Sequence, residues 1–123
     1  MAGVIKGIGV DLLDLARFET HLAATPALIE RLFHPEERTQ TTRRLAASFA
    51  AKEALVKALG GPTGLSWSEL KVWRNTEGQP FLAAEGKSAG TLAQAGIDKI
   101  HLSISHDGGM LIAYLIAEGA DSA

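Results

Sequence analysis

The chain has 123 residues, of which 46% are hydrophobic and 21% charged, and this is the composition of an ordinary globular domain. Its net charge of −2 argues against a general nucleic-acid binder, because such proteins need an excess of cationic side chains. Because the sequence contains no cysteine, it excludes disulfides, thiolate catalysis and cysteine-bound zinc.

Apolar runs are short along the whole sequence. The longest, residues 110–117, falls far short of the roughly 20 residues that a membrane-spanning helix needs. The N-terminus does not resemble a signal peptide either, since Lys6 and Asp11 interrupt its apolar stretch. We therefore expect a soluble, cytoplasmic protein that binds no membrane and forms a single domain over residues 1–123.

The first half of the chain is predicted to be mainly helical. From the N-terminus, the predicted elements are a strand over residues 3–12, a helix over 15–23, a helical turn over 26–32, a helix start at Pro35 and a long helix over 42–59. Asp14 is a suitable N-cap for the first helix, because its carboxylate can accept a hydrogen bond from the first turn. Gly60, which follows the long helix directly, is typical of a helix end.

The second half of the chain is predicted to form most of the sheet. Its elements are strands over residues 68–75 and 80–84, a helix over 89–95, and strands over 99–105 and 110–117. His106-Asp-Gly-Gly109 is a tight hairpin signal between the last two strands. One long helix plus shorter helices packed on a small, mainly antiparallel sheet gives an α+β fold.

The first predicted strand ends in a carboxylate. Side chains alternate along a strand, so Asp11 shares a face with Ile5, Gly7, Gly9 and Leu13. Asp11 then points to the side that two glycines leave bare, where a ligand can approach the backbone. A second interpretation stays open, in which the glycines admit a packed helix and Asp11 only ends the strand.

The long predicted helix carries Glu53 and Lys57 one turn apart. At about 100° per residue, Glu53 falls in the same arc as Leu45 and Phe49, which we expect to face the core. An unpaired carboxylate would be costly there, and a metal ion or another cation would offset that cost. The alternative is an ordinary exposed Glu–Lys pair at positions i and i+4, and both interpretations stay open.

A third candidate lies at the end of a late strand. His106 follows Ser105 beside the hairpin glycines, where it is either an ordinary surface histidine or a donor to a phosphate oxygen. The remaining histidines show no metal-ligand spacing. The sequence also has no Walker loop, Rossmann glycine fingerprint or nucleophile elbow.

Together these motifs resemble a known family. Gly-Ile-Gly-Val-Asp11, the Phe49-Ala-Ala-Lys-Glu-Ala pattern, Gly78-Gln-Pro80 and Ser105-His106 occur in the order typical of the 4′-phosphopantetheinyl transferase superfamily. The resemblance is to its short branch, the holo-(acyl-carrier-protein) synthase type. It extends over nearly the whole chain, and the pattern around Lys52 and Glu53 is its most specific part.

The resemblance implies a defined reaction. Such enzymes move the 4′-phosphopantetheine group of coenzyme A onto a serine of an acyl carrier protein, of the fatty-acid or polyketide type, and release adenosine 3′,5′-bisphosphate. By analogy Asp11 and Glu53 bind Mg²⁺, and Lys57 neutralises charge on the phosphate under attack. The acceptor of the serine proton is left open between a metal-bound water and one of the two carboxylates.

The resemblance also implies binding residues and an assembly. It assigns contacts with coenzyme A to Lys52, Lys57, Ser105 and His106. Arg17 matches a position where the family places a basic residue that docks the acidic carrier protein. Short members of the family assemble as homotrimers with each active site at a subunit boundary, and we expect the same assembly here.

The sequence departs from the family pattern at Ser48, where a basic residue is usual. A phosphate contact is therefore either missing or supplied by a different arginine. Two other functions stay open: a different Mg²⁺-dependent nucleotide or phosphoester enzyme that uses the same carboxylates, and a non-catalytic relative that binds coenzyme A or a carrier protein without turnover.

Overall fold

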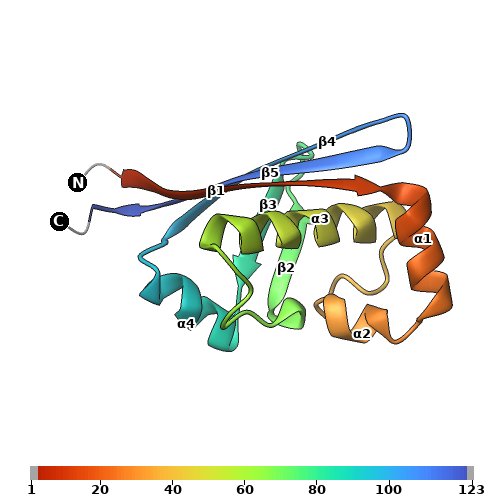
Figure 1. Ribbon diagram of the computed structural model, residues 1–123, viewed down its shortest axis with the longest axis horizontal. Helices are drawn as coiled ribbons and strands as arrows, with labels where there is room; N and C mark the ends of the chain where they lie inside the picture. Colours follow the sequence, from red (N-terminus) through yellow and green to blue (C-terminus); the bar gives the residue numbers. More distant parts are fainter. Residues whose placement is uncertain (1–2, 122–123) are drawn as a thin grey trace.

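A computed structural model describes residues 3–121 and confirms the predicted α+β class (Figure 1). The order of elements is β1 (Gly3–Asp14), α1 (Leu15–Ala24), α2 (Leu28–Leu32), α3 (Thr42–Leu59), a 3₁₀ turn (Trp67–Glu69), β2 (Leu70–Arg74), β3 (Pro80–Ala84), α4 (Gly86–Gln94), β4 (Lys99–Asp107) and β5 (Met110–Ala120). The strands form two antiparallel sheets instead of the single sheet predicted. Helix α3 lies under the larger sheet, with α1 and α2 near one end of it and α4 toward the other (Figure 1).

The larger sheet has the strand order β1-β5-β4. Strands β4 and β5 are joined by a two-residue turn, in which Gly108 and Gly109 have φ values of 56° and 86°. Positive φ at both central positions is the requirement of a type I′ hairpin, which explains the two glycines. Because Asp107 still pairs with Met110, His106 lies inside β4 and not in the turn as its hairpin motif predicted.

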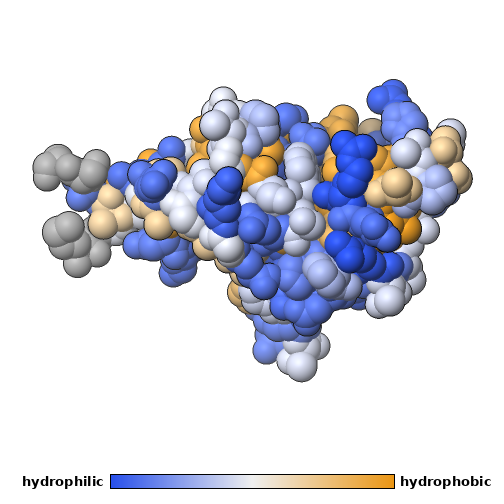
Figure 2. Space-filling model, turned by 90° about the horizontal axis from the view of Figure 1, so that it is seen from below, coloured by the Kyte–Doolittle hydropathy of each residue, from blue (hydrophilic) through white to orange (hydrophobic). Residues whose placement is uncertain are grey.

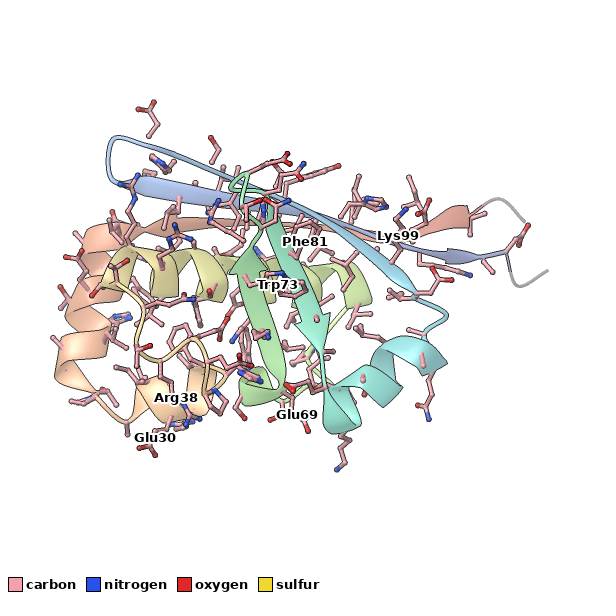
Figure 3. The ribbon with its side chains drawn as sticks, turned by 180° about the vertical axis from the view of Figure 1, so that it is seen from behind. Glu30, Arg38, Glu69, Trp73, Phe81 and Lys99 are labelled. Carbon is pink, nitrogen blue, oxygen red and sulfur yellow. The ribbon has the colours of Figure 1, made fainter. Side chains whose placement is uncertain are left out.

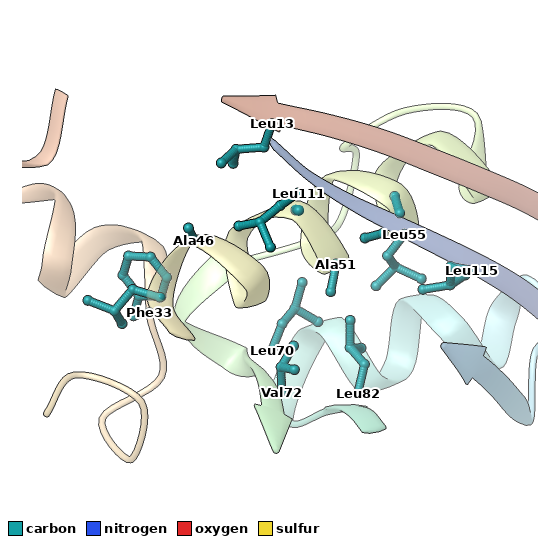
Figure 4. Close-up of a cluster of buried hydrophobic side chains, with 14 of the residues drawn as sticks. Leu13, Phe33, Ala46, Ala51, Leu55, Leu70, Val72, Leu82, Leu111 and Leu115 are labelled. Carbon is teal, nitrogen blue, oxygen red and sulfur yellow. The ribbon is translucent and has the colours of Figure 1, made fainter. Parts of the chain in front are cut away.

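The smaller sheet is the β2–β3 hairpin, which contacts the larger sheet through β3 and β4. Its cross-strand pair Trp73 and Phe81 stacks with a centroid distance of 5.4 Å, and both rings are part of the surface (Figure 3). The opposite face of the hairpin contributes Leu70, Val72 and Leu82 to the core (Figure 4). This alternation fixes the side to which each β2 side chain points.

Helix α3 packs directly on the backbone of β1 at two glycines. A Cβ atom built on Gly9 would lie 1.8 Å from the carbonyl oxygen of Ala54, and one on Gly7 would lie 2.1 Å from that of Ala58. The interpretation in which the glycines admit a packed helix is therefore correct. Ile5 does not share their face, because a register shift between Ile5 and Gly7 turns it outward.

The buried side of α3 differs from the predicted core arc. Alanines such as Ala50 and Ala54 are fully buried and allow the helix to approach the sheet closely, and Leu55 extends into the core (Figure 4). Phe49 and Glu53 lie only half-buried at the border of this side. The expectation that Glu53 lies in the core-facing arc is thus wrong. The side of α3 that packs on the sheet is defined by alanines and not by the arc of Leu45, Phe49 and Val56.

Local signals gave most of the other boundaries, with one clear exception. Asp14 caps α1 by accepting a hydrogen bond from the backbone N–H of Arg17 at 3.0 Å, as predicted. Residues 35–39 form turns and not the helix predicted at Pro35, because the carboxylate of Glu37 points inward and accepts from the N–H of His34. No helix among residues 3–121 is long and apolar enough to cross a membrane.

Candidate functional site

Asp11 and Glu53 line one pocket of about 270 Å³ where β1, α1 and α3 meet. Asp11 comes from the last third of β1, and Glu53 from the middle of α3. The contact of α3 with Gly7 and Gly9 brings the two elements together, so both acidic side chains lie in the same pocket of one chain. Because α3 covers Gly7 and Gly9, the side chain of Asp11 lies beside this helix. It does not face an uncovered stretch of strand backbone, as the sequence suggested.

The acidic pair is only partly neutralised by the protein itself. Burial raises the pKa of Glu53, and the nearby charge of Asp11 raises that pKa further, while Lys57 opposes the shift. Lys57 donates from Nζ to the backbone oxygen of Val10 at 2.9 Å and to Oδ1 of Asp11 at 3.2 Å. The lysine therefore pairs with the carboxylate of β1, and not with Glu53 as in an ordinary i, i+4 surface pair.

The chemistry of this pocket fits a hard divalent cation. No group of three or more His, Asp or Glu residues suited to a metal occurs among the described residues. Asp14 also lines the pocket, but its carboxylate caps α1, so Asp11 and Glu53 are the two carboxylates that the pocket offers to a ligand. Mg²⁺ retains several waters and takes few protein ligands, with phosphate oxygens completing its shell. A cation would also offset the two causes that raise the pKa of Glu53, which are burial and the charge of Asp11. Asp11 and Glu53 are the residues that would hold it.

A second pocket, of about 350 Å³, is strongly basic. Arg43 and Arg44 reach it from the first turn of α3, Arg74 from the end of β2, and His106 from β4. Arg43 Nη2 lies 2.5 Å from Nδ1 and 2.7 Å from Nε2 of His106. Within the described part of the chain, no carboxylate lies within 4.0 Å of the three guanidinium groups. Converging arginines without carboxylate partners are well suited to bind a phosphate group.

Arg74 was missed by the sequence analysis. Burial and the charge of Arg44 lower the pKa of Arg74, so the structure holds two like charges close together. Ser48 is buried beside them, because Arg44 and Arg74 line a small cavity to which Ser48 also contributes. Two arginines thus lie next to the position where the family pattern has a basic residue. The only sequence signal for Arg74 is its place at the end of a strand with an inward-facing Val72.

Ser105 and His106 lie on opposite faces of β4. His106 is paired with buried Leu111 and lines the basic pocket, whereas Ser105 is paired with Ile112 on the outer face of the sheet. Neighbouring side chains of a strand must point in opposite directions, so one chain cannot present both residues to one ligand in this pocket. The structure therefore does not bring Ser105 to His106.

Lys52 does not reach either pocket, which corrects its expected contact with coenzyme A. Its side chain is completely buried, and Nζ donates to Oε1 of Glu37 at 2.6 Å and to the carbonyls of Leu32 and Trp67 at 2.8 and 3.2 Å. Burial lowers the pKa of Lys52, and Glu37 opposes this shift. Because all three ammonium protons are used inside the protein, Lys52 has none left for a ligand.

Arg17 lies on α1 and lines the acidic pocket together with Phe18 and Phe49. Its position is set by the Asp14 cap, which fixes the first turn of α1 directly after β1. A basic side chain therefore borders the acidic pair. Arg43 and Arg44 do not line this pocket and belong to the basic one.

Comparisons with known proteins show the family to which the chain belongs. Residues 7–114 match the family model of the 4′-phosphopantetheinyl transferase superfamily. A holo-(acyl-carrier-protein) synthase of Clavibacter sepedonicus is 51% identical over 116 residues, covering 94% of this chain and 98% of the relative.

Solved structures show the same fold. The holo-ACP-synthase of Plasmodium yoelii superimposes with a TM-score of 0.87 at 29% identity, covering 98% of this chain and 100% of that one. The ACPS–CoA complex of Chronobacterium ammoniagenes has a TM-score of 0.82 at 28% identity, with the same coverage. On these grounds the chain belongs to the 4′-phosphopantetheinyl transferase superfamily.

Proposed function

We propose that this protein transfers the 4′-phosphopantetheine group of coenzyme A to a serine of an acyl carrier protein, depends on Mg²⁺, and releases adenosine 3′,5′-bisphosphate. The observation that carries the proposal is the pocket in which Asp11 and Glu53 meet beside Lys57. Membership of the transferase superfamily and similarity to a complex that contains coenzyme A support the reaction class.

The residues of the acidic pocket match the needs of phosphoryl transfer. The serine oxygen forms a bond to the phosphorus that carries pantetheine and loses its proton to one of the two carboxylates or to a water in the pocket. The bond from that phosphorus to the adenosine 5′-phosphate oxygen breaks, and adenosine 3′,5′-bisphosphate leaves. Mg²⁺, held by Asp11 and Glu53, would neutralise the pyrophosphate. The ammonium group of Lys57 already donates to Asp11, next to the proposed metal site. From there it can stabilise the negative charge that develops on the transferred phosphate.

The basic pocket supports binding of coenzyme A through its phosphates. Arg43, Arg44, Arg74 and His106 supply donors without competing carboxylates, and the guanidinium groups remain charged at every relevant pH. Ser105 faces away from this pocket, so we assign its contact with coenzyme A to the site of a neighbouring copy. Lys52 is not included among the ligands.

The carrier protein is expected to dock at α1. Carrier proteins are acidic, and Arg17 places a cation at the border of the pocket where the serine must enter. Fatty-acid and polyketide carriers share this charge, so the structure favours neither. We place the reaction in the cytoplasm.

The outer face of the larger sheet supports a homotrimer with active sites at subunit boundaries. Its exposed apolar side chains are Ile8, Val10 and Leu12 of β1 and Ile112 and Tyr114 of β5. The face of the molecule seen in Figure 2, turned away from this sheet, is largely hydrophilic. A continuous apolar face on one side is typical of a protein interface, and we assign it to two further copies of the chain.

One experiment tests the proposed reaction. The protein is incubated with coenzyme A, Mg²⁺ and an unmodified acyl carrier protein, and the carrier is then weighed by mass spectrometry. We expect a mass gain of one phosphopantetheine, which is lost when the metal is chelated and in the Asp11→Asn variant. A carrier of unchanged mass under all conditions would contradict the proposed function.

A further inference from the structure

Glu37 and Lys52 form an ion pair that is completely removed from solvent. Lys52 Nζ lies 2.6 Å from Oε1 of Glu37, and neither side chain lines the acidic or the basic pocket. The cost of desolvating two charges offsets most of their attraction, so such a pair is weak evidence for stability. A role in stability alone therefore does not account for it.

The pair acts on the free edge of β2. Among the strands of residues 3–121, β2 pairs only with β3, so its other edge presents backbone N–H groups to no described strand. Oε2 of Glu37 accepts from the N–H of Val72 at 2.8 Å, while Oε1 accepts from the N–H of His34 at 2.9 Å. The carboxylate thus replaces a missing strand at the edge of β2, and Lys52 fixes it from α3.

The hydrogen bond between Glu37 and the backbone of Val72 lies close to the basic pocket. Arg74 follows Val72 by two residues in β2, so both side chains leave the strand on the same side. Arg74 faces Arg43 and Arg44, which belong to α3, the same helix that carries Lys52. The contacts from Lys52 through Glu37 to Val72 therefore connect α3 directly to the strand that carries Arg74.

We propose that Glu37 and Lys52 are positioning residues, which hold Arg74 in the basic pocket and thereby set the affinity of this pocket for a phosphate group of coenzyme A. The proposal rests on the proposed function, because it takes coenzyme A as the ligand. In this proposal the buried pair affects ligand binding through the position of Arg74, without contacting the ligand.

The test is a double-mutant cycle between Glu37→Gln and Arg74→Ala. The introduced amide can still accept from Lys52 and His34 through its oxygen, but its NH₂ group meets the N–H of Val72 and releases the strand edge. Coenzyme A binding is measured by calorimetry, so the readout is independent of turnover. We expect Glu37→Gln to raise the Kd for coenzyme A by about tenfold in the wild-type background. In the Arg74→Ala background the same change is expected to have an effect of less than about twofold, because the positioned group is gone.

Leu92→Ala is the matched control for destabilisation. Leu92 is a core residue of α4 and lines neither the acidic nor the basic pocket, so its truncation weakens the fold and is expected to leave the Kd for coenzyme A unchanged. If Glu37→Gln does not fold, Glu37→Met combined with Lys52→Met removes both charges together and takes its place in the cycle.

Two results would overturn the proposal: a Kd in the Glu37 variant equal to that of the wild type, or effects of Glu37→Gln and Arg74→Ala that simply multiply. Failure of the proposed function is recognised separately. In that case the wild-type protein itself neither binds coenzyme A nor modifies a carrier protein.

Discussion

Replacing Gly9 by alanine tests whether the contact of α3 with β1 builds the acidic pocket. The added Cβ would lie 1.8 Å from the carbonyl oxygen of Ala54, whereas an ordinary contact begins at 3.4 Å, so the helix must retreat by about 1.6 Å. The obstacle is backbone and cannot rotate away. Overpacking of this kind costs typically 1–3 kcal/mol, and we expect a loss near about 3 kcal/mol in the free energy of unfolding.

The variant is expected to lose activity as well as stability. For a chain of this size, a loss of about 3 kcal/mol lowers Tm by roughly 10 °C, which differential scanning calorimetry at a fixed protein concentration will detect. Retreat of α3 also moves Glu53 away from Asp11. Displacements of about 1 Å in a catalytic constellation cost roughly 100-fold in rate, so Mg²⁺-dependent transfer should fall by at least that factor at a temperature where the variant is folded.

Gly90→Ala is the control, because this substitution is expected to raise Tm and not to lower it. Gly90 lies in α4, and a Cβ atom built there meets nothing within 4 Å. Alanine at such a helical site stabilises by about 0.5–1 kcal/mol, so Tm should rise slightly while activity stays at the wild-type level. The reasoning would be refuted if Gly9→Ala melted within about 2 °C of the wild type and also retained its activity. Such a result would mean that the close contact between α3 and β1 does not shape the pocket.

Four further substitutions separate metal binding, charge neutralisation, docking and assembly. Because the folded-state pKa of Glu53 is raised, its ionisation weakens the fold as pH rises through that pKa; Glu53→Gln should therefore raise Tm relative to the wild type at pH 8 but not at pH 4, measured without metal, and should abolish transfer. Lys57→Met should lower kcat/KM by at least about 100-fold with less than about 1 kcal/mol of lost stability, since the pair is solvent-exposed on the lysine side. Asp14→Ala removes the cap of α1 and should cost about 1 kcal/mol, raising KM for the carrier protein but not for coenzyme A. If the proposed trimer forms through the apolar sheet face, Val10→Asp should leave only monomers in analytical ultracentrifugation, because it places a charge on that face.

Elements with strong local end signals were predictable from the sequence. Helix α3 spans Thr42–Leu59 as predicted, because Thr41 caps its start and Gly60, with φ of 82°, ends it in the left-handed conformation. The region after Pro35 was not predictable in the same way. Its conformation depends on Glu37, which follows a helix-like pattern locally but is drawn inward by Lys52, a residue 15 positions away.

The acidic part of the site was predictable, whereas His106 was the one residue of the basic part that the sequence pointed to as a phosphate contact. Asp11 and Glu53 stand in motifs for which the family resemblance implied a shared metal ion, and the structure places both residues in one pocket. Arg74 reaches its pocket only through the pairing of β2 with β3 and the edge contact of Val72. Lys52 is indistinguishable by sequence from a ligand-binding lysine, since burial by distant segments decides its role.

The two consecutive residues Lys52 and Glu53 show how one helix serves both pockets. Successive residues of an α-helix are rotated by about 100°, so Lys52 points to Glu37 and the edge of β2, while Glu53 points toward Asp11 of β1. Any rotation of α3 about its axis would disturb both directions together. The contacts of α3 with Gly7 and Gly9 and the buried Glu37–Lys52 pair therefore both restrain rotation of α3 about its axis. This predicts that Gly9→Ala weakens binding of coenzyme A in the basic pocket even though Gly9 does not line it.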